Sequence, residues 1–237
     1  MNVPPFHWWR TVFFLIPVIG VYTVVLGAVS LVSTLFDRHG YTAHRCARLW
    51  AWLILKTTGV RLTVHGSPPP ADASYVFAAN HQSFYDIPVL FASLPHSLRI
   101  IAKASLGSFP FVGWHLKWAG HLLIRDDDRS AEVLKKMQAM ISDQASLIIF
   151  PEGTRSIDGA VGDFKGGVFL MAINSGLPIV PLSVSGAHRI MVRGRLTTRP
   201  GDVTLTIHPP IATAGLTRAD ARALSQRVQA IVASDVA

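Results

Sequence analysis

Residues 11–36 contain no charged side chain and begin just after a Trp-Trp-Arg sequence. As a helix at ~1.5 Å per residue, this segment would reach about 39 Å, more than the ~30 Å hydrocarbon core of a bilayer. A cleaved signal peptide and a buried core helix are the alternatives, although signal peptides usually have an apolar region of only ~7–15 residues. Pro17 and Gly20 can kink a helix, so insertion into one leaflet is an alternative to spanning. The pattern predicts an N-terminal membrane-associated helix.

Basic residues flank this segment unevenly. Arg10 precedes it beside Trp8 and Trp9, an arrangement typical of an interfacial anchor. The basic residues that follow it are Arg38, Arg45, Arg48, Lys56 and Arg61. If the helix spans a membrane, this bias places the C-terminal part of the chain in the cytoplasm, so we expect an inner (cytoplasmic) membrane location with the active site facing the cytoplasm. Residues 41–59 have the pattern of a second helix along the membrane surface, so we expect anchoring helices in residues 1–60 and a separate domain in residues 61–237.

From residue 61 onward, short β-branched runs alternate with helical patterns. Two runs, 74–79 and 146–150, are almost entirely apolar, which indicates strands buried on both faces. Helices are predicted over 130–141 and after Thr217, where Asp220 completes a capping box. The alternation predicts an α/β fold with a mixed, mostly parallel sheet flanked by helices. The predicted strands are 61–66, 74–79, 98–103, 121–125, 146–150, 178–184 and 203–211.

Composition and charge favour a lipid partner. Only 15% of the 237 residues are charged, against about 25% in an average soluble domain, and the net charge is +8. A basic protein attracts nucleic acid or anionic lipid, and the high hydropathy favours lipid and disfavours nucleic acid as a partner. The single cysteine, Cys46, excludes an intramolecular disulfide and a cysteine metal cluster.

Residues 80–86 read NHQSFYD and lie between two apolar runs. Ser83 and Asp86 have the spacing of a capping box, so on one interpretation they start a helix, with Ser83 as its N-cap. If His81 instead lies in the turn before that helix, the Asp86 carboxylate can orient its imidazole as in a catalytic triad. The sequence of this segment alone leaves both interpretations open.

Residues 150–156, FPEGTRS, follow a predicted buried strand and so project from its C-terminal end. Open α/β sheets bind their ligands at that edge. Pro151 and Gly153 predict a tight turn, and the Arg155 guanidinium suits a phosphate. The alternative is a polar turn with an exposed Glu152–Arg155 ion pair.

Two lysines are further candidates for binding an anion. Lys165 precedes an apolar helix pattern, where its charge opposes the helix dipole unless an anion compensates it, and Lys103 ends a predicted strand. A lysine that extends along the surface towards solvent is the alternative for both. Signatures of serine hydrolases, zinc peptidases, P-loop proteins and dinucleotide-binding proteins are absent from the sequence.

Together these motifs resemble the 1-acylglycerol-3-phosphate (lysophosphatidic acid) acyltransferase family of the PlsC type. Its N-H-x-x-x-x-D block is matched by Asn80, His81 and Asp86, and its F-P-E-G-T-R-S block by residues 150–156. Two later blocks are similar to residues 165–172 and 178–181. One block differs, because the family commonly has Asp-Arg after an apolar run where this chain has Arg125-Asp126; Arg125 or Arg129 is left as the substrate-binding residue.

The resemblance implies a membrane-bound O-acyltransferase. It would transfer a fatty acyl group from acyl-CoA or acyl carrier protein to the sn-2 hydroxyl of lysophosphatidic acid, giving phosphatidic acid in phospholipid biosynthesis. His81 would be the general base and Asp86 its orienting partner, with no metal and no cofactor beyond the acyl thioester. The implied substrate-binding residues are Asn80, Lys103, Arg125, Glu152, Gly153, Thr154, Arg155 and Lys165.

Two other functions remain open at this point. The acceptor could be a different lysolipid, either a lysophospholipid or a lyso-aminolipid. From another class of protein, a non-catalytic membrane protein that binds anionic lipid would share the basic surface, although binding alone needs no histidine base.

Overall fold

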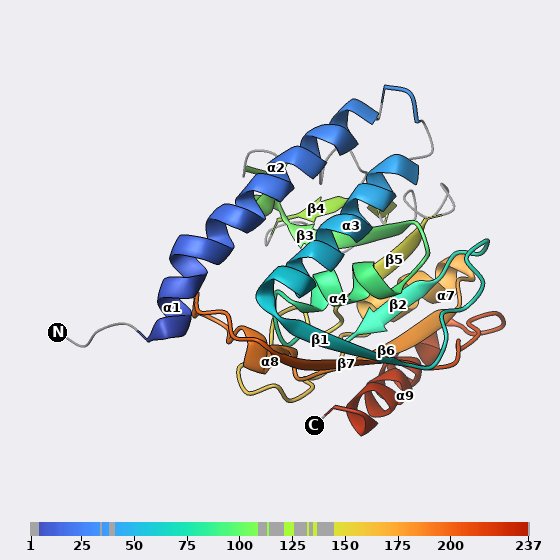
Figure 1. Ribbon diagram of the computed structural model, residues 1–237. Coiled ribbons are helices and arrows are strands. Elements are labelled where there is room, and N and C mark those ends of the chain that lie inside the picture. Colours follow the sequence, from blue (N-terminus) through green and yellow to red (C-terminus); the bar gives the residue numbers. More distant parts are fainter. Residues whose placement is uncertain are drawn as a thin grey trace.

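The computed structural model describes residues 5–33, 35–37, 41–108, 113, 121–125, 132, 135–136 and 145–236. A seven-stranded sheet in the order β1-β7-β6-β2-β5-β3-β4 lies at its centre, with helices on both faces (Figure 1). All neighbouring strands are parallel except β6 and β7, which pair antiparallel. The predicted α/β fold with a mixed, mostly parallel sheet is therefore confirmed.

The strands begin and end close to their predicted bounds, with one exception. They are β1 (Val60–His65), β2 (Val76–Ala79), β3 (Leu98–Lys103), β4 (Leu122–Ile124), β5 (Ser146–Ile149), β6 (Ile179–Ser185) and β7 (Gly201–Ile207). The exception is β7, which was predicted to continue to residue 211. It ends at Ile207 because Pro209 and Pro210 follow, and proline has no N–H to donate to a strand ladder.

Helices connect the strands and cover the sheet. In chain order they are α1 (Phe6–Arg10), the π-helical turn η1 (Thr11–Leu15), α2 (Ile16–Ser33), α3 (Tyr41–Thr58), α4 (Asp86–Ser93), the 3₁₀ turn η2 (Ala104–Ser108), α7 (Gly167–Ser175), α8 (Ala187–Ile190), the 3₁₀ turn η3 (Arg218–Asp220) and α9 (Ala221–Ser234). The capping box of Thr217 and Asp220 is confirmed. The helix predicted over 130–141 lies mostly outside the described residues; Glu132, Lys135 and Lys136 are described and are helical.

The N-terminal helix runs from Phe6 to Ser33 and is long and apolar enough to cross a membrane, a test that signal sequences also pass. Only 6% of its most apolar window is buried, which argues against the buried core helix. The π-helical turn lies just before Pro17, whose ring would clash with the carbonyl of Phe13 in a regular α-helix.

Helices α2 and α3 form an antiparallel hairpin (Figure 1). The Trp50 indole donates to the Thr23 hydroxyl at 2.9 Å between the two helices, and Arg10 Nη2 donates to the Thr58 carbonyl at 2.6 Å. The start of the N-terminal helix therefore lies beside the C-terminal end of α3.

The sheet has an apolar core on each face, because successive strand residues point to opposite sides. In β2, Phe77 and Ala79 contribute to the core with α3 and α4, whereas Val76 and Ala78 contribute to the core with α7 and α9. Helix α3 thus shares a core with the strands. The proposed division at residue 60 stays a prediction.

Candidate active site

Two predicted motifs leave the same edge of the sheet. Strands β2 and β5 are parallel neighbours, with Ala78 opposite Ile149, so residues 80–86 and 150–156 both follow the C-terminal ends of adjacent strands. The Ser156 N–H donates to the His81 carbonyl at 2.7 Å and joins the two segments directly. The topology therefore brings together stretches that are about seventy residues apart in sequence.

Asn80 fixes the first of these segments to β6. Its amide nitrogen donates to the Val184 carbonyl at 2.8 Å, and its amide oxygen accepts from the Val184 N–H at 2.7 Å. The side chain is almost fully buried. This geometry makes Asn80 a positioning residue, and the substrate contact predicted for it stays a prediction.

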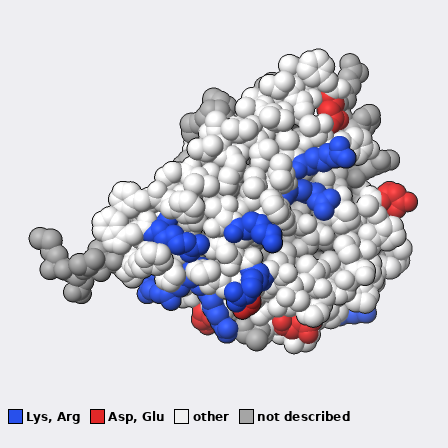
Figure 2. Space-filling model, in the orientation of Figure 1, with Lys and Arg blue, Asp and Glu red and all other residues white. Residues whose placement is uncertain are grey.

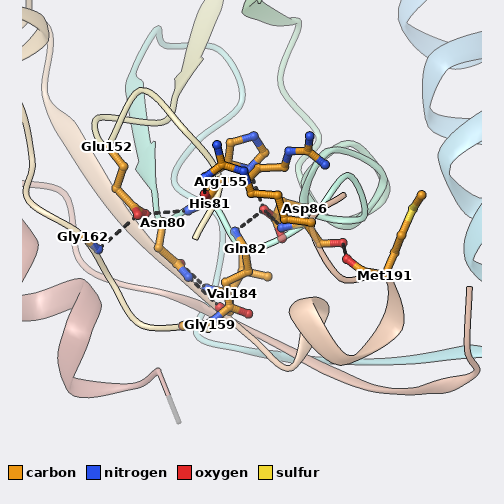
Figure 3. A network of polar contacts seen from close by, with 12 residues as sticks. Asn80, His81, Gln82, Asp86, Glu152, Arg155, Gly159, Gly162, Val184 and Met191 are labelled. Carbon is orange, nitrogen blue, oxygen red and sulfur yellow. Dashed lines mark hydrogen bonds and ion pairs between the residues drawn. The ribbon is translucent and has the colours of Figure 1, made fainter. Parts of the chain in front are cut away.

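His81 and Asp86 form a hydrogen-bonded pair (Figure 3). Nδ1 of His81 lies 2.7 Å from Oδ2 of Asp86, whose side chain is fully buried, whereas the His81 side chain is 17% exposed. A carboxylate accepts a hydrogen bond, so Nδ1 carries the proton and Nε2 of a neutral ring keeps its lone pair. The Phe150 ring stacks on the imidazole at 4.0 Å between centroids and fixes its plane. The arrangement therefore fixes the orientation of a partly exposed imidazole.

The helix that follows begins differently from the capping-box prediction. Helix α4 begins at Asp86, its N-cap is Tyr85, and no side chain caps it, so the prediction that Ser83 is the N-cap is wrong. The Ser83 hydroxyl donates instead to the Met191 carbonyl at 2.9 Å. Half of the box is present, because Asp86 Oδ2 also accepts from the N–H groups of Gln82 (2.7 Å) and Ser83 (2.9 Å). One carboxylate therefore stabilises the turn and orients the imidazole.

Glu152 holds the backbone of the site in place. Its carboxylate accepts from the His81 N–H at 2.7 Å and from the Gly162 N–H at 3.0 Å, and the residue is buried. Burial raises the pKa of Glu152, and the two N–H donors oppose that shift. The alternative of an exposed Glu152–Arg155 ion pair is therefore wrong. The sequence of the 150–156 turn could not reveal the two donors that bind Glu152, because both lie outside that turn.

Cationic side chains surround the 150–156 turn. The Arg155 guanidinium carbon lies 3.8 Å from the centroid of the Phe84 ring, a cation–π contact. Gly153 has φ +72°, and a Cβ there would lie 2.7 Å from Lys165 Nζ, so the ammonium group packs against the turn. Thr154 is exposed beside it. An anion at this turn would meet charges from Arg155 and Lys165.

Comparison with known proteins identifies the family. Residues 61–185, more than half of the chain, match the family model described as Acyltransferase. The chain belongs to the acyltransferase family.

Named relatives of this acyltransferase include two eukaryotic proteins. It is 36% identical over 204 residues to a chloroplastic 1-acyl-sn-glycerol-3-phosphate acyltransferase of Brassica napus, with 82% of this chain and 59% of the relative covered. It is 32% identical over 179 residues to the human 1-acyl-sn-glycerol-3-phosphate acyltransferase alpha, with 72% and 62% covered. The chain therefore covers less than two thirds of the length of either relative.

A solved structure shares the fold of the acyltransferase. The 1-acyl-sn-glycerophosphate acyltransferase PlsC of Thermotoga maritima superposes with a TM-score of 0.75 at 27% identity, over 92% of each chain. The match spans both the N-terminal helices and the sheet.

Two remaining candidates lie further along the same edge of the sheet. Lys103 is the last residue of β3 and pairs in register with Ile124, after which exposed Arg125 follows β4. The Lys103 side chain and Arg129 lie outside the described residues. Within the described ranges, no group of three or more His, Cys, Asp or Glu residues could hold a metal ion.

The sequence did not single out several partners of the site. Phe150 stacks on the His81 imidazole, the Gly162 N–H donates to Glu152, and the Met191 carbonyl accepts from Ser83. Phe150 is the first residue of the FPEGTRS motif, so its position in that motif could have indicated that it belongs to the site. Gly162 and Met191 act through backbone atoms, which their residue types do not reveal.

Proposed function

We propose that this acyltransferase transfers a fatty acyl group from an acyl thioester to the sn-2 hydroxyl of lysophosphatidic acid, giving phosphatidic acid for phospholipid biosynthesis. The observation that carries the proposal is the oriented His81–Asp86 pair beside the Arg155 guanidinium. The names of the two relatives and of the Thermotoga protein support the choice of acceptor.

In the proposed reaction, His81 acts as the general base. Its Nε2 takes the proton from the sn-2 hydroxyl as that oxygen attacks the thioester carbonyl. Buried Asp86 stabilises the imidazolium that forms. Collapse of the tetrahedral intermediate keeps the new C–O bond and breaks the C–S bond, and the thiolate takes up the proton from Nε2. A thiolate leaves readily, so the reaction needs no covalent enzyme intermediate, metal or additional cofactor.

Cations beside the base would bind the acceptor phosphate. Arg155 offers a planar fork that matches phosphate oxygens, and Lys165 adds a point charge at the same turn. We assign Lys103 and Arg125 a supporting role at the neighbouring strand ends. Gly153 and Thr154 would line the contact, while Glu152 would act indirectly by holding the His81 backbone.

The N-terminal hairpin would hold the enzyme at a membrane. Its apolar side chains are largely exposed, including Phe13, Phe14, Val21 and Val25. Both lipid substrate and lipid product would stay in the bilayer, whereas the donor, acyl-CoA or acyl carrier protein, arrives from the cytoplasm. We therefore place the active site at the cytoplasmic face of the membrane.

A thiol-release assay tests this function. Purified protein in neutral detergent is given acyl-CoA or acyl carrier protein donors together with lysophosphatidic acid, a lysophospholipid, a lyso-aminolipid or monoacylglycerol. We expect rapid release with lysophosphatidic acid and none from His81→Ala. Release only with a different lysolipid would refute the acceptor, and no release from any pair would refute enzymatic activity in favour of lipid binding.

A further inference from the structure

Residues 191–199, named here the arginine loop, join α8 to β7 and contact two parts of the protein at once. The Met191 carbonyl accepts from Ser83 Oγ in the active-site turn, at 2.9 Å. Near the other end, the Thr198 N–H donates to the buried Thr11 hydroxyl of the N-terminal helix at 3.0 Å. The Arg199 N–H closes the base of the loop by donating to the Ile190 carbonyl at 2.8 Å. The loop is therefore attached at both ends.

A tight turn at the tip of the loop positions Arg193. The Arg195 N–H donates to the Val192 carbonyl at 3.0 Å, and Gly194 has φ +79°, a value that glycine adopts readily at the third position of a turn. Arg193 occupies the second position. Its Nη1 donates to the Arg155 carbonyl at 2.6 Å, so the Arg193 side chain lies next to Arg155, the proposed phosphate-binding residue.

The two arginines place like charges together beside the base. Within the part of the chain that the structure describes, neither guanidinium forms an ion pair with a carboxylate. Burial lowers the pKa of Arg155, the nearby Arg193 charge lowers it further, and the Asp86 carboxylate opposes both effects in part. Basic side chains also gather around α8 and the start of the N-terminal helix in Figure 2. A bound anion would relieve this repulsion.

We propose that Arg193 is a second phosphate ligand, which acts with Arg155 to select phosphomonoester acceptors over phosphodiesters. The contact with the Arg155 carbonyl uses one of the five N–H donors of Arg193 and leaves the others for a ligand. A phosphomonoester carries about −1.5 to −2 charges and three terminal oxygens, enough for two guanidinium forks. A diester carries one charge and two such oxygens, so it gains less from the second arginine. The inference rests on the proposed function and deepens it.

Kinetics of matched variants test the role of Arg193. In neutral detergent, Arg193→Ala should raise the KM for lysophosphatidic acid about tenfold or more, which is the loss expected for hydrogen bonds to a charged group. The kcat, and the KM for a lysophosphodiester, should change less than about twofold on the same reasoning. Arg195→Ala removes an equal charge from the same turn and should behave as wild type. Equal effects of the two substitutions, or equal effects on monoester and diester, would overturn the inference.

Arg193→Gln separates charge from polarity, because glutamine removes the charge and keeps a side-chain N–H donor. We expect it to resemble Arg193→Ala; recovery to wild-type KM would make Arg193 a structural residue only and would sink the proposal.

Calorimetric titration with glycerol 3-phosphate distinguishes failure of this inference from failure of the proposed function. If the protein turns over no acceptor but binds glycerol 3-phosphate in a way that depends on Arg193, the proposed acyl-transfer function is refuted and the phosphate site is retained. Absence of binding to wild type would overturn the site.

Discussion

Replacing Asp86 by asparagine should nearly abolish turnover while leaving the protein folded. The Oδ2 atom accepts three hydrogen bonds, from His81 Nδ1 and the N–H groups of Gln82 and Ser83. The asparagine oxygen can keep those contacts at this position, but its NH₂ group then takes the place of Oδ1. That oxygen is buried and has no hydrogen-bond partner among the described residues, so the amide donors would be buried unpaired.

Two magnitudes follow for this substitution. An unpaired buried donor costs about 1–3 kcal/mol, so we expect the free energy of unfolding to fall by about that amount. The loss of kcat should be larger, about 10³–10⁴-fold, because a neutral amide lacks the negative charge that stabilises the imidazolium. The two losses can be measured separately. A loss of stability that leaves the protein folded would not by itself lower the kcat.

The assay combines thiol-release kinetics with chemical denaturation of Asp86→Asn. Asp158→Asn is the matched control, since Asp158 is exposed and accepts hydrogen bonds from nearby Ser156 and Ala160, so its kcat should stay near the wild-type value. A kcat for Asp86→Asn within about tenfold of wild type would refute the orienting role of the carboxylate.

Two further predictions concern stability. Gly159→Ala should cost about 1–3 kcal/mol, because φ is +91° and the new Cβ would lie 2.6 Å from His188 Nδ1, whereas Gly166→Ala meets nothing within 4 Å and should be far milder in thermal melts. Burial, with help from nearby arginines, lowers the pKa of His44 from 6.5 to about 4, so the unfolded state binds its proton first and stability falls as the pH drops from 6.5 towards 4. Denaturant titrations at pH 7.5 and pH 5 should show this loss reduced in His44→Leu and unchanged when exposed His65 becomes glutamine; an unaltered loss in His44→Leu would contradict the assignment.

Patterns that depend on neighbouring residues predicted much of the fold. Strands such as β2 and β5 are short apolar runs that stop at polar motifs, and burial on both faces of a parallel sheet requires that pattern. The same reasoning placed residues 80–86 and 150–156 at strand ends. Their side-by-side location follows from strand order, which the sequence alone did not specify.

The errors arose where a distant partner competed with a local one. Ser83 was expected to cap a helix, but the Met191 carbonyl, 108 residues away in sequence, takes its hydroxyl. An ion pair with nearby Arg155 was one expectation for Glu152, but two backbone N–H groups bind its carboxylate instead. The spacing of residues in the sequence indicates which partners a side chain can reach within its own turn. Tertiary packing decides whether the side chain bonds to one of those partners or to a distant residue.

Under the proposed function, the hydrogen bond between Thr198 and Thr11 would determine where the acceptor binds relative to the lipid surface. Trp8, Trp9 and Arg10 directly precede Thr11 and are residue types that settle at the boundary between headgroups and hydrocarbon. Tying Thr198 to this level would hold Arg193 at the height of the lipid phosphates. A lysolipid could then reach the base by moving sideways within its own leaflet, with its acyl chain still in the hydrocarbon. Its escape into water would be unnecessary at any step.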